Sequence, residues 1–277
     1  MSNYHSLNRT NLLVHFYYIL FFMQSLSIKN ADLKQIRLIA TDLDGTLTQA
    51  EKFSTRLLAK LEQLAQYQIA VLIVTGRSAG WVDGIRTYLP VVGAIAENGG
   101  LYYPSSHDDP EIFISLKNLT EHRQALAKIF EELKTFFPHL TESLDNSFRL
   151  TDWTFEVEGL TLSELEKINQ ICQEQNWSFT YSTIQCHIKP LQQNKANCLL
   201  QVLKNYFPHL SLSEIITVGD SLNDESLFNP VLFPNSVGVA NIVHYLPQLK
   251  YHPKYITNQP ECLGFCEIAD LILSTFI

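Results

Sequence analysis

The stretch Ile36-Arg37-Leu38-Ile39-Ala40-Thr41-Asp42-Leu43-Asp44-Gly45-Thr46 decides how the rest of the chain is interpreted. Its first half is a short apolar run rich in β-branched residues, which is typical of a buried parallel strand. Asp42 and Asp44 follow at the carboxyl end, the edge at which open α/β sheets bind their ligands. Positions two apart in extended chain share a side, so both carboxylates can face one point while Gly45 turns the chain away.

Asp42 and Asp44 carry like charges, which repel each other unless a cation or a shared proton lies between them. The stretch therefore predicts a metal ion, a shared proton, or both. A D-x-D-G sequence alone is more often an ordinary strand-to-helix loop with two solvated aspartates. The prediction consequently depends on partners elsewhere in the chain.

The composition is that of a globular protein with a substantial core, because 46% of the 277 residues are hydrophobic and 17% are charged. This length is sufficient for one large domain or, more naturally, for two. A net charge of −8 argues against a nucleic-acid partner, since there is no basic stripe to neutralise phosphates. A small phosphorylated metabolite stays compatible, because it needs only a local positive site and a cation.

Residues 1–32 are predicted to form an N-terminal extension without a catalytic role. The apolar run from Leu12 to Met23 is shorter than the roughly 20 residues that span a bilayer, so we expect no stable membrane span. Arg9 before it and Ser25 behind it resemble a signal peptide faintly, which leaves a targeting segment as the alternative. The cysteines indicate core thiols in a reducing compartment, and hence a cytoplasmic location: Cys172, Cys186, Cys198, Cys262 and Cys266.

Helical and strand-like segments alternate on both sides of a different central stretch. Segments 33–101 and 190–277 contain apolar strands separated by helices, an order that predicts a doubly wound parallel sheet. The expected strands cover 69–74, 91–96, 214–218, 237–239 and 255–257, and the expected helices cover 54–66, 78–89, 195–207 and 264–276.

Segment 102–189 is predicted to be an α+β cap domain inserted into this α/β core. Its strands at 148–157 and 177–188 alternate in polarity, which is typical of an antiparallel sheet with one wet face. Arg149, Asp152 and His187 could contact a ligand, but polar positions on an alternating strand are usually solvated, so we expect them to lie on that exposed face and do not count them as site residues. A strand at 112–116 and helices at 120–137 and 162–175 complete the unit.

Two further strand ends carry residues suited to a phosphate and a cation. Thr75-Gly76-Arg77 combines a hydroxyl with free N–H groups at a helix start, which favours an anion site. Asp220 follows another strand, with Asn223 and Asp224 just after it, and Lys195 begins the helix upstream. Phosphoryl transfer needs oxygen ligands for a hard cation together with N–H and lysine donors. There is no P-loop and no G-x-G-x-x-G motif, so nucleotide chemistry is not indicated.

These motifs resemble, in order and across residues 36–277, those of the haloacid dehalogenase (HAD) superfamily of aspartate-nucleophile phosphatases. The resemblance implies that Asp42 is the nucleophile and Asp44 the general acid/base. The size and position of the cap resemble subfamily IIB (C2B), which includes Cof-like sugar phosphatases, sucrose-phosphate phosphatase and mannosyl-3-phosphoglycerate phosphatase. Glu97-Asn98-Gly99-Gly100 looks like the E-N-G-G element of the last of these.

The resemblance implies Mg²⁺-dependent hydrolysis of a small phosphate monoester, a sugar phosphate or a glycosyl-phosphoglycerate, through an aspartyl-phosphate. Mg²⁺ would be held by Asp42, the backbone carbonyl of Asp44, and Asp220. The other implied residues are Lys195 for charge compensation, Thr75, Gly76, Arg77 and Asn98 for substrate binding, and Asn223 and Asp224 for the metal site.

Several alternatives stay open at the level of the sequence. Arg77 either binds substrate or pairs with a carboxylate, Glu97 and Asn98 either touch ligand or shape the cap hinge, and Lys189 is the rival of Lys195. A phosphosugar mutase is one alternative function, since eukaryotic phosphomannomutases look similar in core and cap. A catalytically silent binding protein is another. No transferable motif in the cap names the substrate.

Overall fold

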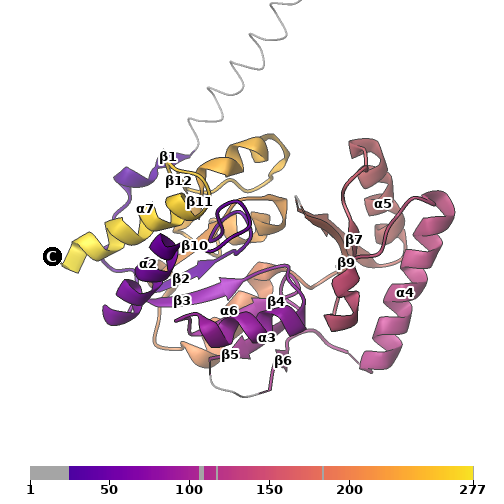
Figure 1. Cartoon of the computed structure of the whole chain (residues 1–277), viewed down its shortest axis with the longest axis horizontal. Coiled ribbons are helices and arrows are strands. Elements are labelled where there is room, and N and C mark those ends of the chain that lie inside the picture. Colours follow the sequence, from indigo (N-terminus) through magenta and orange to yellow (C-terminus); the bar gives the residue numbers. More distant parts are fainter. Residues whose placement is uncertain (1–24, 106–108, 117, 183, 277) are drawn as a thin grey trace, which may run out of the picture.

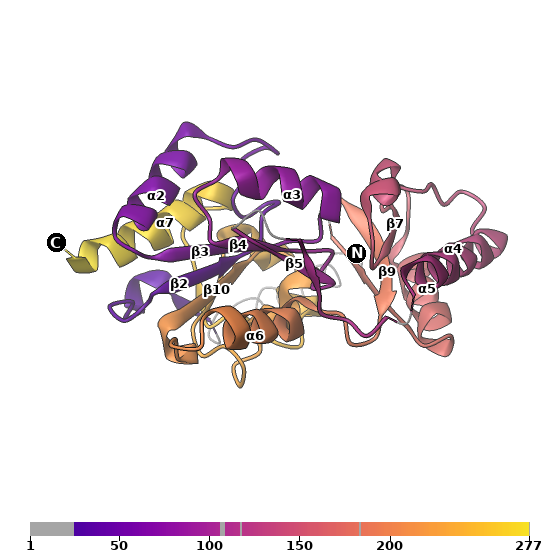
Figure 2. The same cartoon turned by 90° about the horizontal axis from the view of Figure 1, so that it is seen from below.

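Two β-sheets of different size organise the chain into a larger and a smaller unit that lie side by side (Figures 1 and 2). The computed structural model describes residues 25–105, 109–116, 118–182 and 184–276. The larger unit contains a nine-stranded sheet and the smaller unit a three-stranded one. This arrangement is the α/β core with an inserted α+β unit that the sequence predicts.

The larger sheet is parallel at its centre, where β10, β2 and β3 are neighbours. Its strand order is β1-β12-β11-β10-β2-β3-β4-β5-β6, and only the β4–β5 and β5–β6 pairs are antiparallel. The strands are β1 (Leu26–Ser27), β2 (Leu38–Thr41), β3 (Ala70–Val74), β4 (Gly93–Ala96), β5 (Leu101–Pro104), β6 (Glu111–Ile112), β10 (Ile215–Gly219), β11 (Ser236–Gly238) and β12 (Tyr255–Ile256).

Helices cover both faces of this sheet, as Figure 2 shows. Alternate residues of β2 point to opposite sides: Ile39 packs into the core beneath α2, α3 and α7, whereas Leu38 and Ala40 pack against α6. Strands buried on both faces have few polar positions, which is why these runs are almost continuously apolar. The helices are α2 (Thr55–Gln66), α3 (Ala79–Tyr88), α6 (Lys195–Tyr206) and α7 (Glu261–Leu273).

The smaller unit is an antiparallel sheet in the order β7-β9-β8 with helices α4 and α5 packed on one face. Helix α5 begins with the capping box that its sequence predicts: Glu164 N–H donates to Thr161 Oγ1, and Thr161 N–H donates to Glu164 Oε2. The elements are α4 (Leu119–Phe136), β7 (Trp153–Glu156), α5 (Leu162–Glu174), β8 (Trp177–Tyr181) and β9 (Gln185–Pro190).

Three boundaries differ from those expected. Strand β6 and most of β5 fall in the range 102–189 assigned to the cap, yet both strands pair with the larger sheet. The prediction missed them because they are short and the residues between them have the composition of a loop. The segment 177–188 is a hairpin, β8 and β9, whose connection lacks the Gly, Pro or Asn that signals a turn. Only 153–156 of the expected strand 148–157 is extended sheet.

The end of the predicted N-terminal extension also belongs to the larger sheet, because β1 pairs with β12 and Ile28 is fully buried. The apolar run Leu12 to Met23 lies outside the described residues. Within the described part of the chain, no helix is long and apolar enough to cross a membrane. The five cysteines are buried and free, as expected of core thiols, and a cytoplasmic location stays a prediction.

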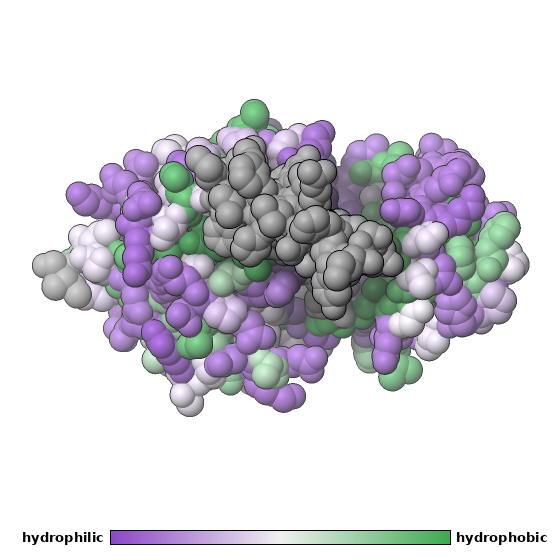
Figure 3. Space-filling view, turned by 90° about the horizontal axis from the view of Figure 1, so that it is seen from above, coloured by the Kyte–Doolittle hydropathy of each residue, from purple (hydrophilic) through white to green (hydrophobic). Residues whose placement is uncertain are grey.

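Hydrophilic side chains cover most of the described surface that is visible in Figure 3. Hydrophobic residues form only small, scattered areas on that face. The surface therefore agrees with a chain whose apolar residues are concentrated in its cores.

Candidate active site

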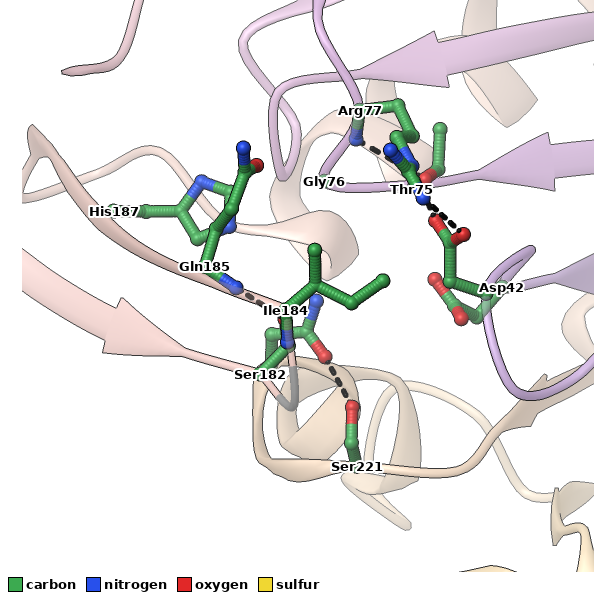
Figure 4. A pocket seen from close by; sticks show the side chains of 11 residues that line it. Asp42, Thr75, Gly76, Arg77, Ser182, Ile184, Gln185, His187 and Ser221 are labelled. Carbon is green, nitrogen blue, oxygen red and sulfur yellow. Dashed lines mark hydrogen bonds and ion pairs between the residues drawn. The ribbon is translucent and has the colours of Figure 1, made fainter. Parts of the chain in front are cut away.

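The central strands of the larger sheet bring three of the predicted motifs to one edge. Asp42 follows β2, Thr75 follows β3 and Asp220 follows β10, and these three strands are parallel neighbours. Adjacent strands lie about 4.8 Å apart, so residues at their carboxyl ends meet. The edge lies beneath the β8–β9 hairpin of the smaller unit, which contributes to the same pocket (Figure 4).

Three buried carboxylates form a compact cluster at this edge. Asp42, Asp220 and Asp224 each offer one oxygen, and these oxygens all lie within 4.8 Å of one another. Lys195, whose side chain is fully buried, places Nζ 2.6 Å from Asp42 Oδ1 and 2.6 Å from Asp224 Oδ1. The structure thus brings Lys195 to the cluster, whereas Lys189 donates to the backbone carbonyl of Gln193 instead.

The cluster carries more negative charge than its single lysine neutralises. Burial raises the pKa of Asp42 to about 7, and it raises that of Asp220 well above its usual value, with neighbouring carboxylates adding to both effects. The pKa of Lys195 is raised despite its burial, because Asp224 and Asp42 favour its charged form. Closely spaced carboxylate oxygens that lack sufficient positive charge fit a hard divalent cation.

Gly45 and Asn241 fix the position of the Asp220 carboxylate. Gly45 has a φ of +76°, and a Cβ there would overlap Asp220 Oδ2, which explains the glycine of the D-x-D-G stretch. Asn241 Nδ2 donates to Asp220 Oδ2 at 2.8 Å and to the Gly45 carbonyl at 3.1 Å. Asn241 was not predicted from the sequence, although its place just after strand β11 puts it at the same edge of the sheet.

Asp44 pairs with Arg77 and is not a member of the carboxylate cluster. Arg77 donates to both Asp44 oxygens, from Nε at 2.8 Å and from Nη2 at 2.7 Å. The Arg77 guanidinium also lies over the Trp81 ring, 5.4 Å from its centroid. Of the two alternatives for Arg77, pairing with a carboxylate is the one that this conformation displays.

Thr75 and Gly76 belong to the turn that the sequence predicts to bind phosphate, called the phosphate-binding turn below. Thr75 is almost fully buried, and its Oγ1 accepts a hydrogen bond from the Arg77 N–H at 3.1 Å. A Cβ on Gly76 would lie 3.0 Å from Asn98 Nδ2 and 3.3 Å from His187 Cε1. Only a residue without a side chain leaves this turn open between its neighbours.

The Glu97-Asn98-Gly99-Gly100 element connects the two units. The buried Glu97 carboxylate accepts from the backbone N–H groups of Ala79, Leu150 and Thr151, so it joins the start of α3 to the smaller unit. Asn98 Oδ1 accepts from Asn223 Nδ2 at 3.2 Å, and Asn98 Nδ2 is buried without a partner. The element therefore joins the two units through Glu97, while Asn98 contacts Asn223 of the pocket lining.

The expectation that Arg149, Asp152 and His187 face water is wrong. All three are buried, with exposed fractions of 2%, 0% and 2%. Arg149 donates to Asp152 and to the Gly76 carbonyl at 3.0 Å, and His187 Nδ1 lies 2.8 Å from Asp152 Oδ2. The polar face of the three-stranded sheet covers the larger unit rather than solvent, so alternation identified the face but not its surroundings.

Both units line one pocket, shown in Figure 4. The larger unit supplies the nucleophile candidate and the phosphate-binding turn, and the smaller unit supplies the opposite wall. The lining residues are Asp42, Asp44, Thr75, Gly76, Arg77, Ser221 and Asn223 from the former and Ser182, Ile184, Gln185 and His187 from the latter.

The fold and this site define a phosphatase of the HAD type, and comparison with known proteins agrees. The profile of the sucrose-6F-phosphate phosphohydrolase family matches residues 35–267. The chain therefore belongs to that family, and it is a phosphoric monoester hydrolase. This result rules out the alternative of a catalytically silent protein.

Individual relatives cover nearly the whole chain. A phosphoglycolate phosphatase of Staphylothermus marinus is 27% identical over 248 residues, which are 86% of this chain and 98% of that protein. A structure from Thermoplasma acidophilum superposes with a TM-score of 0.70 at 19% identity, covering 87% and 99% of the two chains. The sucrose-phosphatase of Synechocystis, solved with sucrose and phosphate, has a TM-score of 0.63 at 15% identity, with 86% and 98% covered.

Proposed function

We propose that the protein hydrolyses a small sugar-like phosphate monoester with Mg²⁺ through an aspartyl-phosphate on Asp42. The observation that carries this proposal is the buried carboxylate cluster, whose member Asp42 lines the same pocket as the Thr75–Gly76 turn. Mg²⁺ bound by Asp42, Asp220 and the Asp44 carbonyl would neutralise the charge that develops on the phosphoryl group. Asn223 and Asp224 would support that site.

Asp42 is poised to act as the nucleophile. Lys195 holds its Oδ1, and Oδ2 has no hydrogen bond with any of the described residues. In the first step an Asp42 oxygen bonds to phosphorus as the bond from phosphorus to the leaving alcohol breaks. The Thr75 hydroxyl and nearby backbone N–H groups would hold the phosphoryl oxygens, and Lys195 favours the ionised form of Asp42 against the effect of burial.

Asp44 transfers the protons in both steps. It gives a proton to the departing oxygen and then removes one from the water that cleaves the aspartyl-phosphate. Its carboxylate must leave the Arg77 guanidinium to do so, and both side chains are about one quarter exposed, which leaves room for that rotation. The smaller unit acts as a cap that shields the site and selects the leaving group.

Phosphate release from p-nitrophenyl phosphate, measured with Mg²⁺ and with a chelator, tests the proposal. We expect turnover that depends on Mg²⁺ and is lost in Asp42→Asn, by at least about 10³-fold. Asp32→Asn is the matched control, because Asp32 is exposed and outside the pocket. Metal-independent turnover, or substantial turnover by Asp42→Asn, would contradict the mechanism.

A further inference from the structure

We propose that the Asp152–His187 pair determines specificity, with His187 Nε2 accepting a hydrogen bond from a hydroxyl of the leaving alcohol. This inference rests on the proposed function, because it assigns a recognition role within the same pocket. It concerns a residue pair that carries no role in the bond-making steps above.

The His187 side chain lies next to the phosphate-binding turn. The residue lies on β9 and lines the pocket opposite Asp42 (Figure 4). Its Cε1 would lie 3.3 Å from a Cβ placed on Gly76. A phosphoryl group held at Thr75 and Gly76 would therefore have its leaving group beside the His187 ring.

The hydrogen bond to Asp152 fixes which ring nitrogen faces the substrate. Nδ1 lies 2.8 Å from Asp152 Oδ2, and Arg149 donates to both oxygens of the same carboxylate. Although burial opposes ionisation, Arg149 and His187 together lower the pKa of Asp152 to about 2, so the carboxylate is ionised near neutral pH. Nδ1 therefore carries the proton and donates it, which leaves Nε2 as an acceptor.

Nε2 is the ring nitrogen of His187 that this arrangement leaves available for a ligand. It makes no hydrogen bond with any of the described residues, while the side chain itself is only 2% exposed. Its neighbour Gln185 is already engaged by Arg149 and Asp145. A ring nitrogen that has no protein partner and belongs to a pocket-lining side chain is available to accept a hydrogen bond from a ligand.

The charges around His187 favour the neutral ring. Arg149 already neutralises Asp152, and Lys189 adds a second positive charge nearby; together with burial, these cations lower the pKa of His187 despite its hydrogen bond to Asp152. A neutral Nε2 acceptor suits a hydroxyl donor, whereas the carboxylate of a leaving group such as glycolate would place two acceptors face to face. The pair thus favours hydroxyl-bearing phosphate esters over phosphoglycolate.

Two variants separate this role from a structural one. An asparagine amide can replace Nδ1 and keep the contact with Asp152, whereas a glutamine amide reaches the position of Nε2. His187→Asn should therefore lose recognition, and His187→Gln should retain more of it. His139→Asn is the control, because the His139 side chain is half exposed and lies outside the pocket.

The probes are glucose 6-phosphate, glycerol 3-phosphate, phosphoglycolate and p-nitrophenyl phosphate, each assayed for kcat and KM with Mg²⁺. We expect wild-type protein to prefer a hydroxyl-bearing ester to phosphoglycolate. In His187→Asn, kcat/KM for that ester should fall on the order of 10-fold or more, mainly through KM, with a smaller change for p-nitrophenyl phosphate.

The outcomes separate this inference from the proposed function. No wild-type turnover of any probe would contradict the phosphatase mechanism itself. With turnover intact, a wild-type preference for phosphoglycolate would overturn the role of His187, and so would an equal loss for all probes in His187→Asn. A loss restricted to hydroxyl-bearing esters, partly recovered in His187→Gln, would support it.

Discussion

The two buried charge clusters of this protein both pair aspartates with cationic side chains, but they differ in the ratio of negative to positive charge. At the larger sheet, Asp42, Asp220 and Asp224 share one lysine, and the pKa of Asp42 rises to about 7 chiefly through burial. In the smaller unit, Asp152 is equally buried, yet Arg149 and His187 bring its pKa down to about 2. Burial penalises both carboxylates, so the supply of cations decides the outcome.

This difference separates a cluster that needs a metal ion from a cluster whose charges are balanced by the protein itself. The first cluster lacks positive charge and gains by accepting a metal ion. In the second cluster Arg149 neutralises Asp152 and also donates to the Gly76 carbonyl across the junction of the units. Removing a cationic side chain should therefore have different consequences in the two clusters. Added Mg²⁺ should restore stability only when the cation is removed from the Asp42 cluster.

The largest effect is expected from Arg149→Met. Removing the guanidinium leaves Asp152 buried without its main partner, so the free energy of unfolding should fall by about 3–5 kcal/mol. Mg²⁺ should not restore it, as urea unfolding with and without the metal would reveal. Arg56→Met is the control: its exposed ion pair with Asp270 should be worth less than about 1 kcal/mol. Full rescue of Arg149→Met by Mg²⁺ would contradict the distinction.

Mg²⁺ itself should stabilise the wild-type protein. Binding only to the folded state adds about 2.7 kcal/mol when the free ion is at 100 times its Kd. Thermal unfolding with Mg²⁺ and with a chelator measures this gain, and Asp220→Asn should reduce it. An unchanged Tm in saturating Mg²⁺ would indicate that the cluster is not a metal site.

The two clusters should respond to pH with opposite signs. Asp152 has a folded-state pKa below the usual 3.8, so its ionised form adds about 2 kcal/mol to the free energy of unfolding above pH 4. This contribution is lost as the pH falls toward 2. Asp42 in metal-free protein has a raised pKa, so its ionisation opposes folding as the pH rises from about 4 to about 7.

Asparagine variants compared with wild type by denaturant unfolding across pH should reveal these slopes. Asp152→Asn should be most destabilising above pH 4. Asp42→Asn, measured in chelator, should become relatively more stable than wild type as the pH rises. If the stability of the two variants relative to wild type changed with pH in the same way, the clusters would not differ in their charge balance.

The smallest effect is expected from Asn241→Ala. Loss of its bonds to Asp220 and to the Gly45 carbonyl should lower stability by about 1 kcal/mol and weaken Mg²⁺ binding about 10-fold. Asn235→Ala removes a comparable bond, to the Ser213 carbonyl, without touching the site. Equal Mg²⁺ affinities in the two variants would remove Asn241 from the metal site.

The conformation of Asp44 and the surroundings of the smaller sheet could not be predicted from the sequence. Asp44 and Arg77 are 33 positions apart, and nothing local specifies that their side chains meet. The alternating polarity of the strand that contains His187 indicated that one face of the smaller sheet is polar. A polar face is equally compatible with exposure to water and with a polar contact to another unit. Asn241 was missed for the same reason, because its partners belong to other strands.

The sequence by itself determined the α/β core, the inserted unit and the strand ends that carry Asp42, Thr75 and Asp220, because hydrophobic periodicity and turn residues act over short stretches of chain. Because these strands are parallel neighbours, their carboxyl ends necessarily lie at the same edge of the sheet. Only the tertiary structure decided which cations neutralise which carboxylates, since that depends on side chains far apart in the chain meeting in a low-dielectric interior. That distribution of cations leaves one cluster in need of a metal ion and makes the other a fixed part of the fold.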